Sequence, residues 1–272
     1  MMTIDSDAHA IENEQTWTYV ERSARALMPT LVTERSGGGP HRRHWLFDGR
    51  ALPLADPGGD THRPSRELTD VEARLRHMDE LGIDLQVLYP TVFLRPLTKR
   101  PEVELALCQS YNRWLGDIWS QGKGRLRWAA VLPLSSMDTA LDELKVARDH
   151  GACAVFMNGI EHDLTLDNPH FFPLYAAASD LDVPIGVHAG NNSFAWQDLF
   201  SRESGYSRAK LSVVSAFHSL LSARVPARFP RLRIGFIEGA AQWIPATIQS
   251  GAGSKSTGRS IFPWRPMSAS SP

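Results

Sequence analysis

From residue 68 onwards, short apolar segments alternate with longer segments whose apolar residues recur at helical spacing. The apolar segments predict strands at 85–89, 126–134, 152–157, 184–188 and 232–237. The segments between them predict helices at 71–81, 103–119, 137–150, 169–181 and 208–221. The strands lack in-out alternation, as is typical of a parallel sheet covered by helices. With an earlier strand in the stretch 3–12, this alternation predicts a (β/α)8 barrel or a doubly wound sheet.

Two observations separate these folds. No Gly-x-Gly-x-x-Gly motif follows the first strand, so the phosphate-binding turn of a doubly wound nucleotide fold is missing and the barrel is favoured. About six strands are present where a closed barrel needs eight. We therefore expect a TIM-barrel-like domain over 1–248 that is incomplete at its C-terminal end. Residues 249–272 are rich in Gly, Ser and Pro and predict an irregular or disordered tail.

A polar insertion, residues 13–65, interrupts the pattern after the first strand. Glycine and proline punctuate it throughout. Residues 45–52 predict a small hairpin that turns at Asp48-Gly49. Trp17, Trp45 and Phe47 favour partial packing of this insertion over a site, although a loosely held surface loop is the alternative.

Composition excludes several classes of protein. The 272 residues carry a formal net charge of -1, which does not suggest binding to nucleic acid or to an acidic membrane surface. No signal peptide and no apolar run long enough to cross a bilayer are apparent. The two cysteines, Cys108 and Cys153, lie in apolar contexts and indicate buried thiols of a reducing compartment. We therefore expect a cytoplasmic protein.

The first strand carries the clearest chemical signal. Asp7 and His9 are two residues apart, so a strand places both side chains on one face. A carboxylate and an imidazole together suit zinc, iron or manganese. A chance surface turn is the alternative. Glu12 follows directly and is either a group supporting the ligands or a charge at a helix start.

The strand ends of a parallel barrel meet at one mouth, where catalytic groups gather. His188 ends an apolar strand and faces the mouth with Asp7 and His9, so three metal ligands from two strands are expected. A core histidine bonded to backbone is the alternative. Glu238 ends the last predicted strand and is either a ligand or proton-transfer group, or an ion-pair partner of an arginine.

Three further residues are candidates for substrate binding. Tyr89 and Asn158 lie at strand ends, and Trp45 lies in the insertion. They would line a pocket for an aromatic or unsaturated acid, although aromatic residues near loops more often serve packing.

At these residues the sequence resembles the amidohydrolase-related branch of the metal-dependent hydrolases, which includes aminocarboxymuconate semialdehyde decarboxylase. The similar segments are 4–12, 78–91, 184–188 and 228–238, within a resemblance that covers most of residues 3–245. The resemblance implies a distorted (β/α)8 barrel with one divalent metal, often zinc, held by Asp7, His9 and His188. It also implies nonoxidative decarboxylation or hydrolysis of a small carboxylic acid, and a homodimer.

One departure from the family pattern bears on activity. Relatives supply an aspartate from the last barrel strand, in a segment like Ser-Asp-Tyr-Pro, and this chain has no such segment. Glu238 lies where some relatives place a histidine that polarises substrate or water. Two hypotheses follow: a single-metal lyase or hydrolase in which Glu238 transfers a proton with His188 beside it, and a truncated, non-catalytic remnant that only binds metal or ligand.

Overall fold

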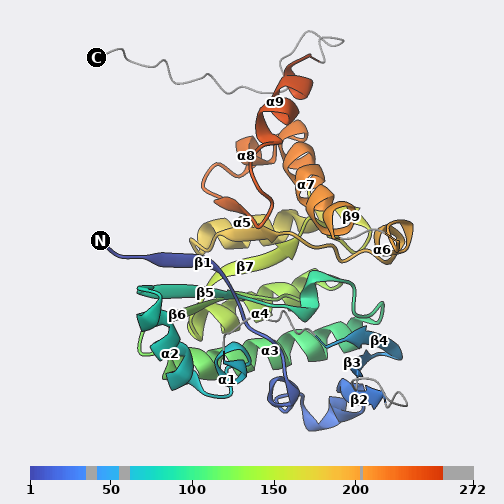
Figure 1. Cartoon of the computed structure of the whole chain (residues 1–272). Coiled ribbons are helices and arrows are strands. Elements are labelled where there is room, and N and C mark those ends of the chain that lie inside the picture. The colour runs from blue at the N-terminus through green and yellow to red at the C-terminus, as the bar shows by residue number, and fades with distance from the viewer. Residues whose placement is uncertain (35–41, 55–61, 203–204, 254–272) are drawn as a thin grey trace.

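The structure, a computed structural model, describes residues 1–34, 42–54, 62–202 and 205–253. Its main sheet has six parallel strands in the order β1-β5-β6-β7-β10-β11 (Figure 1). These are β1 (Ile4–His9), β5 (Leu85–Tyr89), β6 (Leu126–Ala130), β7 (Ala152–Asn158), β10 (Ile185–His188) and β11 (Ile234–Ile237). Each strand is added beside its predecessor, and the order never reverses as it does in a doubly wound sheet. The sheet is therefore part of a (β/α)8 barrel, as predicted.

Helices cover the sheet and connect its strands. The longer ones are α2 (Val71–Glu80), α3 (Pro101–Gln121), α4 (Met137–Asp149), α5 (Phe172–Asp180), α7 (Leu211–Ser222) and α9 (Ile244–Gly253). The shorter ones are α1 (Arg63–Arg66), α6 (Phe194–Leu199) and α8 (Val225–Arg228). The ends of α2 follow from local chemistry, since the Asp70 carboxylate accepts the Ala73 N–H and Gly82 stops the helix with a φ of 66°.

The main core lies between the strands and these helices. Strand residues such as Leu88, Trp128 and Val187 pack against helix residues such as Leu115 and Leu144. Each fully buried aliphatic side chain of this kind contributes about 1.5–3 kcal/mol relative to an exposed one. The sheet therefore holds its strand ends on a well-packed base.

The insertion forms its own small sheet of β2 (Thr30–Glu34), β3 (Arg42–Phe47) and β4 (Arg50–Pro53). The predicted hairpin is confirmed, and its turn residues Asp48 and Gly49 have φ values of 46° and 79°, as a type I′ turn requires. Trp17, Trp45 and Phe47 form a second apolar cluster that packs on α3. The described part of the insertion is thus packed. Residues 35–41 and 55–61 lie outside the described part of the chain.

Several predicted boundaries differ from the structure. The strand predicted at 126–134 ends at Ala130, because Asn112 takes the Val131 N–H and Pro133 has no amide hydrogen to donate. The strand predicted at 232–237 begins at Ile234, since the Leu232 N–H bonds within a turn to Phe229. Residues 249–253, expected to belong to an irregular tail, are helical in α9, and 254–272 lie outside the described residues.

Three further features concern the described part of the chain. Among the described residues, β1 and β11 each have one neighbouring strand, so the curled sheet has two open edges. None of the described helices combines the length and apolar character that a membrane span requires. Cys108 lies in α3 and Cys153 in β7, and both are free thiols.

Candidate metal centre

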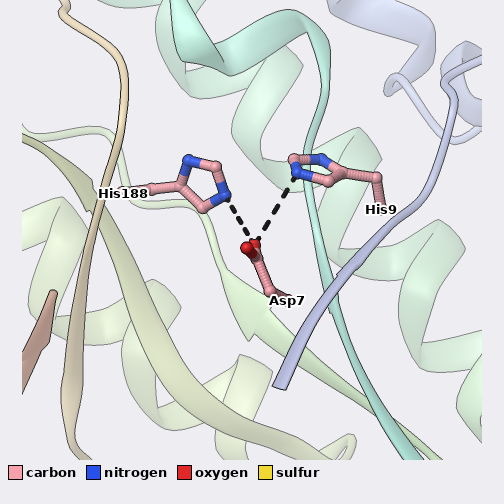
Figure 2. A group of neighbouring side chains, drawn as sticks. All are labelled: Asp7, His9 and His188. Carbon is pink, nitrogen blue, oxygen red and sulfur yellow. Dashed lines mark hydrogen bonds and ion pairs between the residues drawn. The ribbon is translucent and has the colours of Figure 1, made fainter. Parts of the chain in front are cut away.

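Asp7, His9 and His188 meet at the carboxyl ends of β1 and β10 (Figure 2). One ligand atom from each residue can be chosen so that all three lie within 4.8 Å of one another. The distance from Asp7 Oδ1 to Nε2 is 3.2 Å for His188 and 4.0 Å for His9. The two imidazole rings stand edge to face with centroids 5.0 Å apart. The three residues singled out in the sequence are therefore neighbours in space.

A backbone carbonyl lies beside Nδ1 of both rings. His9 Nδ1 lies 3.1 Å from Pro90 O, and His188 Nδ1 lies 3.1 Å from Ala189 O. Because a carbonyl only accepts, a hydrogen bond there needs the proton on Nδ1. His188 Nε2 also lies 3.2 Å from Asp7 Oδ1, which accepts as well, so in His188 the proton can serve either contact. With the proton on Nδ1, the Nε2 of each ring would be available to bind a cation, which is the orientation that metal-ligating histidines adopt.

The electrostatics of the cluster also suit a cation. Burial lowers the pKa of His9 below its usual value, and the neighbouring His188 lowers it further, against the opposing effects of Asp7 and Glu238. His188 is completely buried. Two imidazoles beside a carboxylate form a donor set that fits zinc, manganese or iron. The residues present therefore fit one divalent metal.

A buried chain of polar contacts holds β1 in place. Arg74 donates to Gln86 Oε1 at 2.7 Å, and Gln86 Nε2 donates to Asp5 Oδ2 at 2.9 Å. Arg74 also donates to the His9 carbonyl at 3.3 Å. The β1–β5 register shifts by one residue between Asp5 and Ala8, which marks a bulge next to Asp7. These contacts fix the strand from which two of the candidate ligands project.

Glu238 follows β11 and lies beside the cluster. Its Oε2 is 3.8 Å from His188 Nδ1, its side chain is 49% exposed, and its backbone φ is 57°. A left-handed conformation is uncommon for glutamate and here directs the chain sharply after the strand. Among the described residues, its ion-pair partner is His188 and not an arginine. The carboxylate is thus placed next to the candidate metal ligands.

Aromatic side chains form the floor around His188. The ring centroids of Tyr89 and Phe156 lie 5.2 and 6.1 Å from that of His188. Burial raises the pKa of Tyr89 well above its usual value, so its hydroxyl stays protonated and able to donate. Tyr89 therefore borders the cluster, as the substrate-binding hypothesis requires.

Glu12 serves the loop after β5. Its two carboxylate oxygens accept the N–H groups of Thr91 and Val92 at 2.9 and 3.1 Å. Burial raises its pKa to about 7. Thr91 also donates to the Ala10 carbonyl at 2.8 Å, so this loop is tied twice to the segment that carries the ligands. Glu12 is therefore not a charge at a helix start, and it acts through these contacts with the loop.

The two remaining candidates lie in different places. Asn158 is the register partner of His188 on the neighbouring strand, is buried, and donates through Nδ2 to the Phe93 carbonyl at 3.1 Å. Trp45 packs with Trp17 and Phe47 in the cluster under the insertion. The structure therefore brings Asn158 next to the site and does not bring Trp45 there.

Sequence reasoning missed several polar residues near the site. Gln86 lies inside a predicted apolar strand and Arg74 inside a predicted helix. A polar residue at a buried position of such a segment is the signal that could have revealed this pair. Glu104, Glu161 and His162 come together around a cavity next to Asn158. Glu161 follows the end of the strand predicted at 152–157 by four residues, but Glu104 lies on a helix and gives no local signal.

The sheet is curled and parallel, and one aspartate and two histidines cluster at the carboxyl ends of its strands. Together these features define a barrel of the metal-dependent hydrolase type. The chain belongs to the Amidohydrolase family, whose pattern it matches over residues 4–261. Among curated proteins, it is 21% identical over 120 residues to 2-amino-3-carboxymuconate-6-semialdehyde decarboxylase from Dictyostelium discoideum. That match covers 44% of this chain and 33% of the relative, about a third of its length.

Solved structures share the fold at low sequence identity. An amidohydrolase from Mycobacterium avium subsp. paratuberculosis K-10 superposes with a TM-score of 0.75 at 18% identity, covering 97% of this chain and 79% of that one. A dihydroxybenzoic acid decarboxylase from Polaromonas sp. JS666, solved with manganese and the inhibitor 2-nitroresorcinol, gives 0.62 at 17% identity, covering 96% and 74%. The family resemblance and the predicted fold class are confirmed.

Proposed function

We propose that this protein is an enzyme that holds one divalent metal through Asp7, His9 and His188 and acts on a small carboxylic acid. The observation that carries the proposal is the approach of three ligand atoms to within 4.8 Å at the carboxyl end of the sheet. Nonoxidative decarboxylation is the favoured reaction, with hydrolysis as the alternative. The names of the decarboxylases to which the chain is similar support this order.

Zinc, manganese and iron all suit the donor set, and the manganese of the Polaromonas structure makes that ion a useful first choice. When bound, such a metal binds a carboxylate oxygen or lowers the pKa of a bound water towards about 7. The two backbone carbonyls that accept from the imidazoles orient His9 and His188 for this role.

The remaining chemistry falls to residues of the chain itself. Breaking a carbon–carboxylate bond releases carbon dioxide and leaves the electron pair on carbon, which must then take up a proton. We propose Glu238 for this step, because it lies 3.8 Å from the His188 ring and is half exposed, so that it would hold the proton and exchange it with solvent. In a hydrolysis the same carboxylate would instead accept a proton from water. Tyr89 would donate its hydroxyl to the substrate.

Metal content tests the proposal directly. The wild-type protein, loaded with manganese or zinc and desalted, should retain about one ion per chain. His188→Ala should lose most of it, because one of three protein ligands is gone. His218→Ala is the matched control, since His218 is exposed on α7 and lies outside the cluster. Equal metal content in wild type and His188→Ala would refute the metal site.

The second candidate function is a non-catalytic, metal- or ligand-binding remnant. The absence of one residue favours it. The family pattern has an aspartate from the last strand, and the cluster has no counterpart of it among the described residues. Carbon dioxide release from dihydroxybenzoic acids by the metal-loaded protein separates the two candidates. Retained metal without release of carbon dioxide or hydrolysis of any tested acid would support the remnant.

We also propose a cytoplasmic location and a homodimer for this enzyme.

A further inference from the structure

Two buried polar side chains connect α2 and β5 to the strand that carries Asp7 and His9. Arg74 of α2 is 6% exposed and Gln86 of β5 is 4% exposed. Burying a guanidinium costs free energy unless its hydrogen bonds are made. Apolar side chains of similar size would pack at these two positions without that cost. The contacts of the pair therefore indicate what it does.

Donors and acceptors give the contacts of this pair a fixed direction. A guanidinium only donates, so Gln86 Oε1 accepts from Arg74 Nε at 2.7 Å. The Gln86 amide nitrogen then donates to Asp5 Oδ2 at 2.9 Å, and Asp5 Oδ1 accepts the Asp7 N–H at 3.1 Å. The four residues form one chain of hydrogen bonds that ends on the backbone of a candidate metal ligand.

The same guanidinium also reaches the second candidate ligand on β1. Arg74 Nη2 lies 3.3 Å from the His9 carbonyl oxygen, and Nη1 lies 3.4 Å from the Ser65 carbonyl oxygen. Both contacts are long compared with the 2.7 Å bond to Gln86, so the link through Gln86 is the stronger one. Arg74 therefore contacts His9 directly and Asp7 through two intermediate side chains.

These contacts lie where the pairing of β1 with β5 is interrupted. Between Asp5 and Ala8, β1 has two residues where β5 has one, and Asp7 is one of the two. A bulge of this kind leaves backbone groups outside the regular ladder and redirects the side chains next to it. Asp5 takes the Asp7 N–H inside the bulge, and Arg74 donates to the His9 carbonyl just after it. The hydrogen-bond chain thus supports the backbone where the ladder does not.

We infer that Arg74 and Gln86 are positioning residues of the metal centre, which hold the bulged backbone of β1 so that its two ligands bind one ion together. This inference rests on the proposed function, in which Asp7, His9 and His188 hold the metal. Asp7 and His9 project from β1, and His188 projects from β10 (Figure 2). Two of the three ligands therefore depend on the bulge. Breaking the hydrogen-bond chain should weaken metal binding although every ligand is kept.

The zinc affinity of Gln86→Leu tests the inference, measured by competition with a chromophoric chelator. Leucine fills a similar volume and removes both hydrogen bonds of the amide. The variant should bind zinc about 10-fold more weakly than wild type or more, as is typical when a residue that orients metal ligands is lost. Arg74→Met should show a loss of similar size. The double variant should lose little more than either single variant, because both substitutions break the same chain.

A second comparison uses Arg74 alone, so the test does not depend on Gln86→Leu folding. Arg74→Lys keeps the charge and a donor for Gln86, and it should bind zinc more tightly than Arg74→Met. In the metal-free protein, amide hydrogen exchange at Asp7 and His9 should be faster in Arg74→Met than in wild type, with no change in β10. Equal exchange at Asp7 and His9 in the two proteins would contradict the support of the bulge.

Leu75→Ala is the matched control for a general loss of stability. Leu75 is buried next to Arg74 on α2, and its side chain is apolar. Its removal should lower the free energy of unfolding of the metal-free protein, measured by urea denaturation, and leave the zinc affinity of the folded protein unchanged. A loss of zinc affinity that Leu75→Ala shares would overturn the positioning role, because instability would then be the cause.

The outcomes also separate this inference from the proposed function. Wild-type protein that binds no zinc would refute the metal site, and with it any role in holding the ligands. Wild-type protein that binds zinc, with Gln86→Leu and Arg74→Met binding it equally well, would overturn the positioning role and leave the metal site intact.

Discussion

Glu12 shows how a single buried carboxylate can support a site without touching a ligand. Both of its oxygens accept backbone N–H groups from the loop after β5. Its side chain is nearly fully buried, and burial raises its pKa from an ordinary value of 4.5 to about 7. The folded protein therefore binds this proton more tightly than the unfolded chain does.

This difference predicts how stability depends on pH. Between pH 4.5 and about 7 the folded state holds more protons at Glu12 than the unfolded state, so its contribution to stability falls as the pH rises through that window. A rise in the pKa of this size corresponds to about 3 kcal/mol. Relative to wild type, Glu12→Gln should gain stability across this window, measured by urea denaturation. Glu14 is exposed, so Glu14→Gln should show no such trend. A stability difference between Glu12→Gln and wild type that does not change with pH would contradict the raised pKa.

At the residue scale, the sequence predicted the side chains that a strand end exposes. Asp7 and His9 were recognisable from their spacing of two residues on a strand, and His188 and Glu238 because each follows a short apolar run; parallel strands bring such ends together. Trp45 was assigned to the pocket on its chemistry alone, and its burial under the insertion depends on a hairpin docking on α3.

At the scale of elements, one close approach joins the end of β7 to the start of α7. A Cβ added at Gly159 would lie 2.3 and 2.4 Å from the backbone C and O of Ser212. Ser212 in turn donates to the Gly190 carbonyl at 2.5 Å, close to His188 in the chain. Only glycine leaves room for this contact, which places α7 against the strand ends that carry the site.

Gly159→Ala should therefore destabilise the fold. Backbone atoms cannot turn aside as a flexible side chain can, so we expect a loss of about 3 kcal/mol in the free energy of unfolding, measured by chemical denaturation. Gly235→Ala is the matched control on β11, because its added Cβ meets nothing nearer than Ile237 Cδ1 at 3.7 Å. That variant should lose less than about 1 kcal/mol. Equal losses in both variants would remove the close approach as the cause.

The sequence predicted the existence and order of the elements well, and their ends less well. Apolar runs defined β5, β6, β7 and β10 because helices bury these strands, whereas the more exposed β1 was recognised from the spacing of Asp7 and His9. The end of β6 depends on Asn112 of α3, nineteen residues earlier in the chain, and no local pattern reveals such a contact. The start of the helix predicted at 208 is a π-helical turn, Tyr206–Lys210, before α7 proper.

At the scale of the whole molecule, we expect the open edges of the sheet to lower solubility. Among the described residues, β1 and β11 each leave one edge without a partner strand, and Ile4 on β1 is 53% exposed. Exposed apolar strand edges promote pairing between molecules. The predicted barrel was correct in its topology, but the number of strands rather than their pattern decides whether it closes.

Ile4→Lys should reduce concentration-dependent association, because a charged side chain on an edge strand opposes pairing with another edge. Light scattering over a range of protein concentrations measures the effect. Val146→Lys is the control, since Val146 is 49% exposed but lies on helix α4. If both substitutions reduce association equally, then added charge and not the strand edge is responsible.

The candidate ligands do not come from adjacent strands, since β5, β6 and β7 separate β1 from β10 in the sheet. An ion held by Asp7, His9 and His188 would consequently act as a cross-brace from one side of the curl to the other. Removing the ion would loosen the link between these two strands. The curvature of the described sheet would then depend in part on whether a metal is bound.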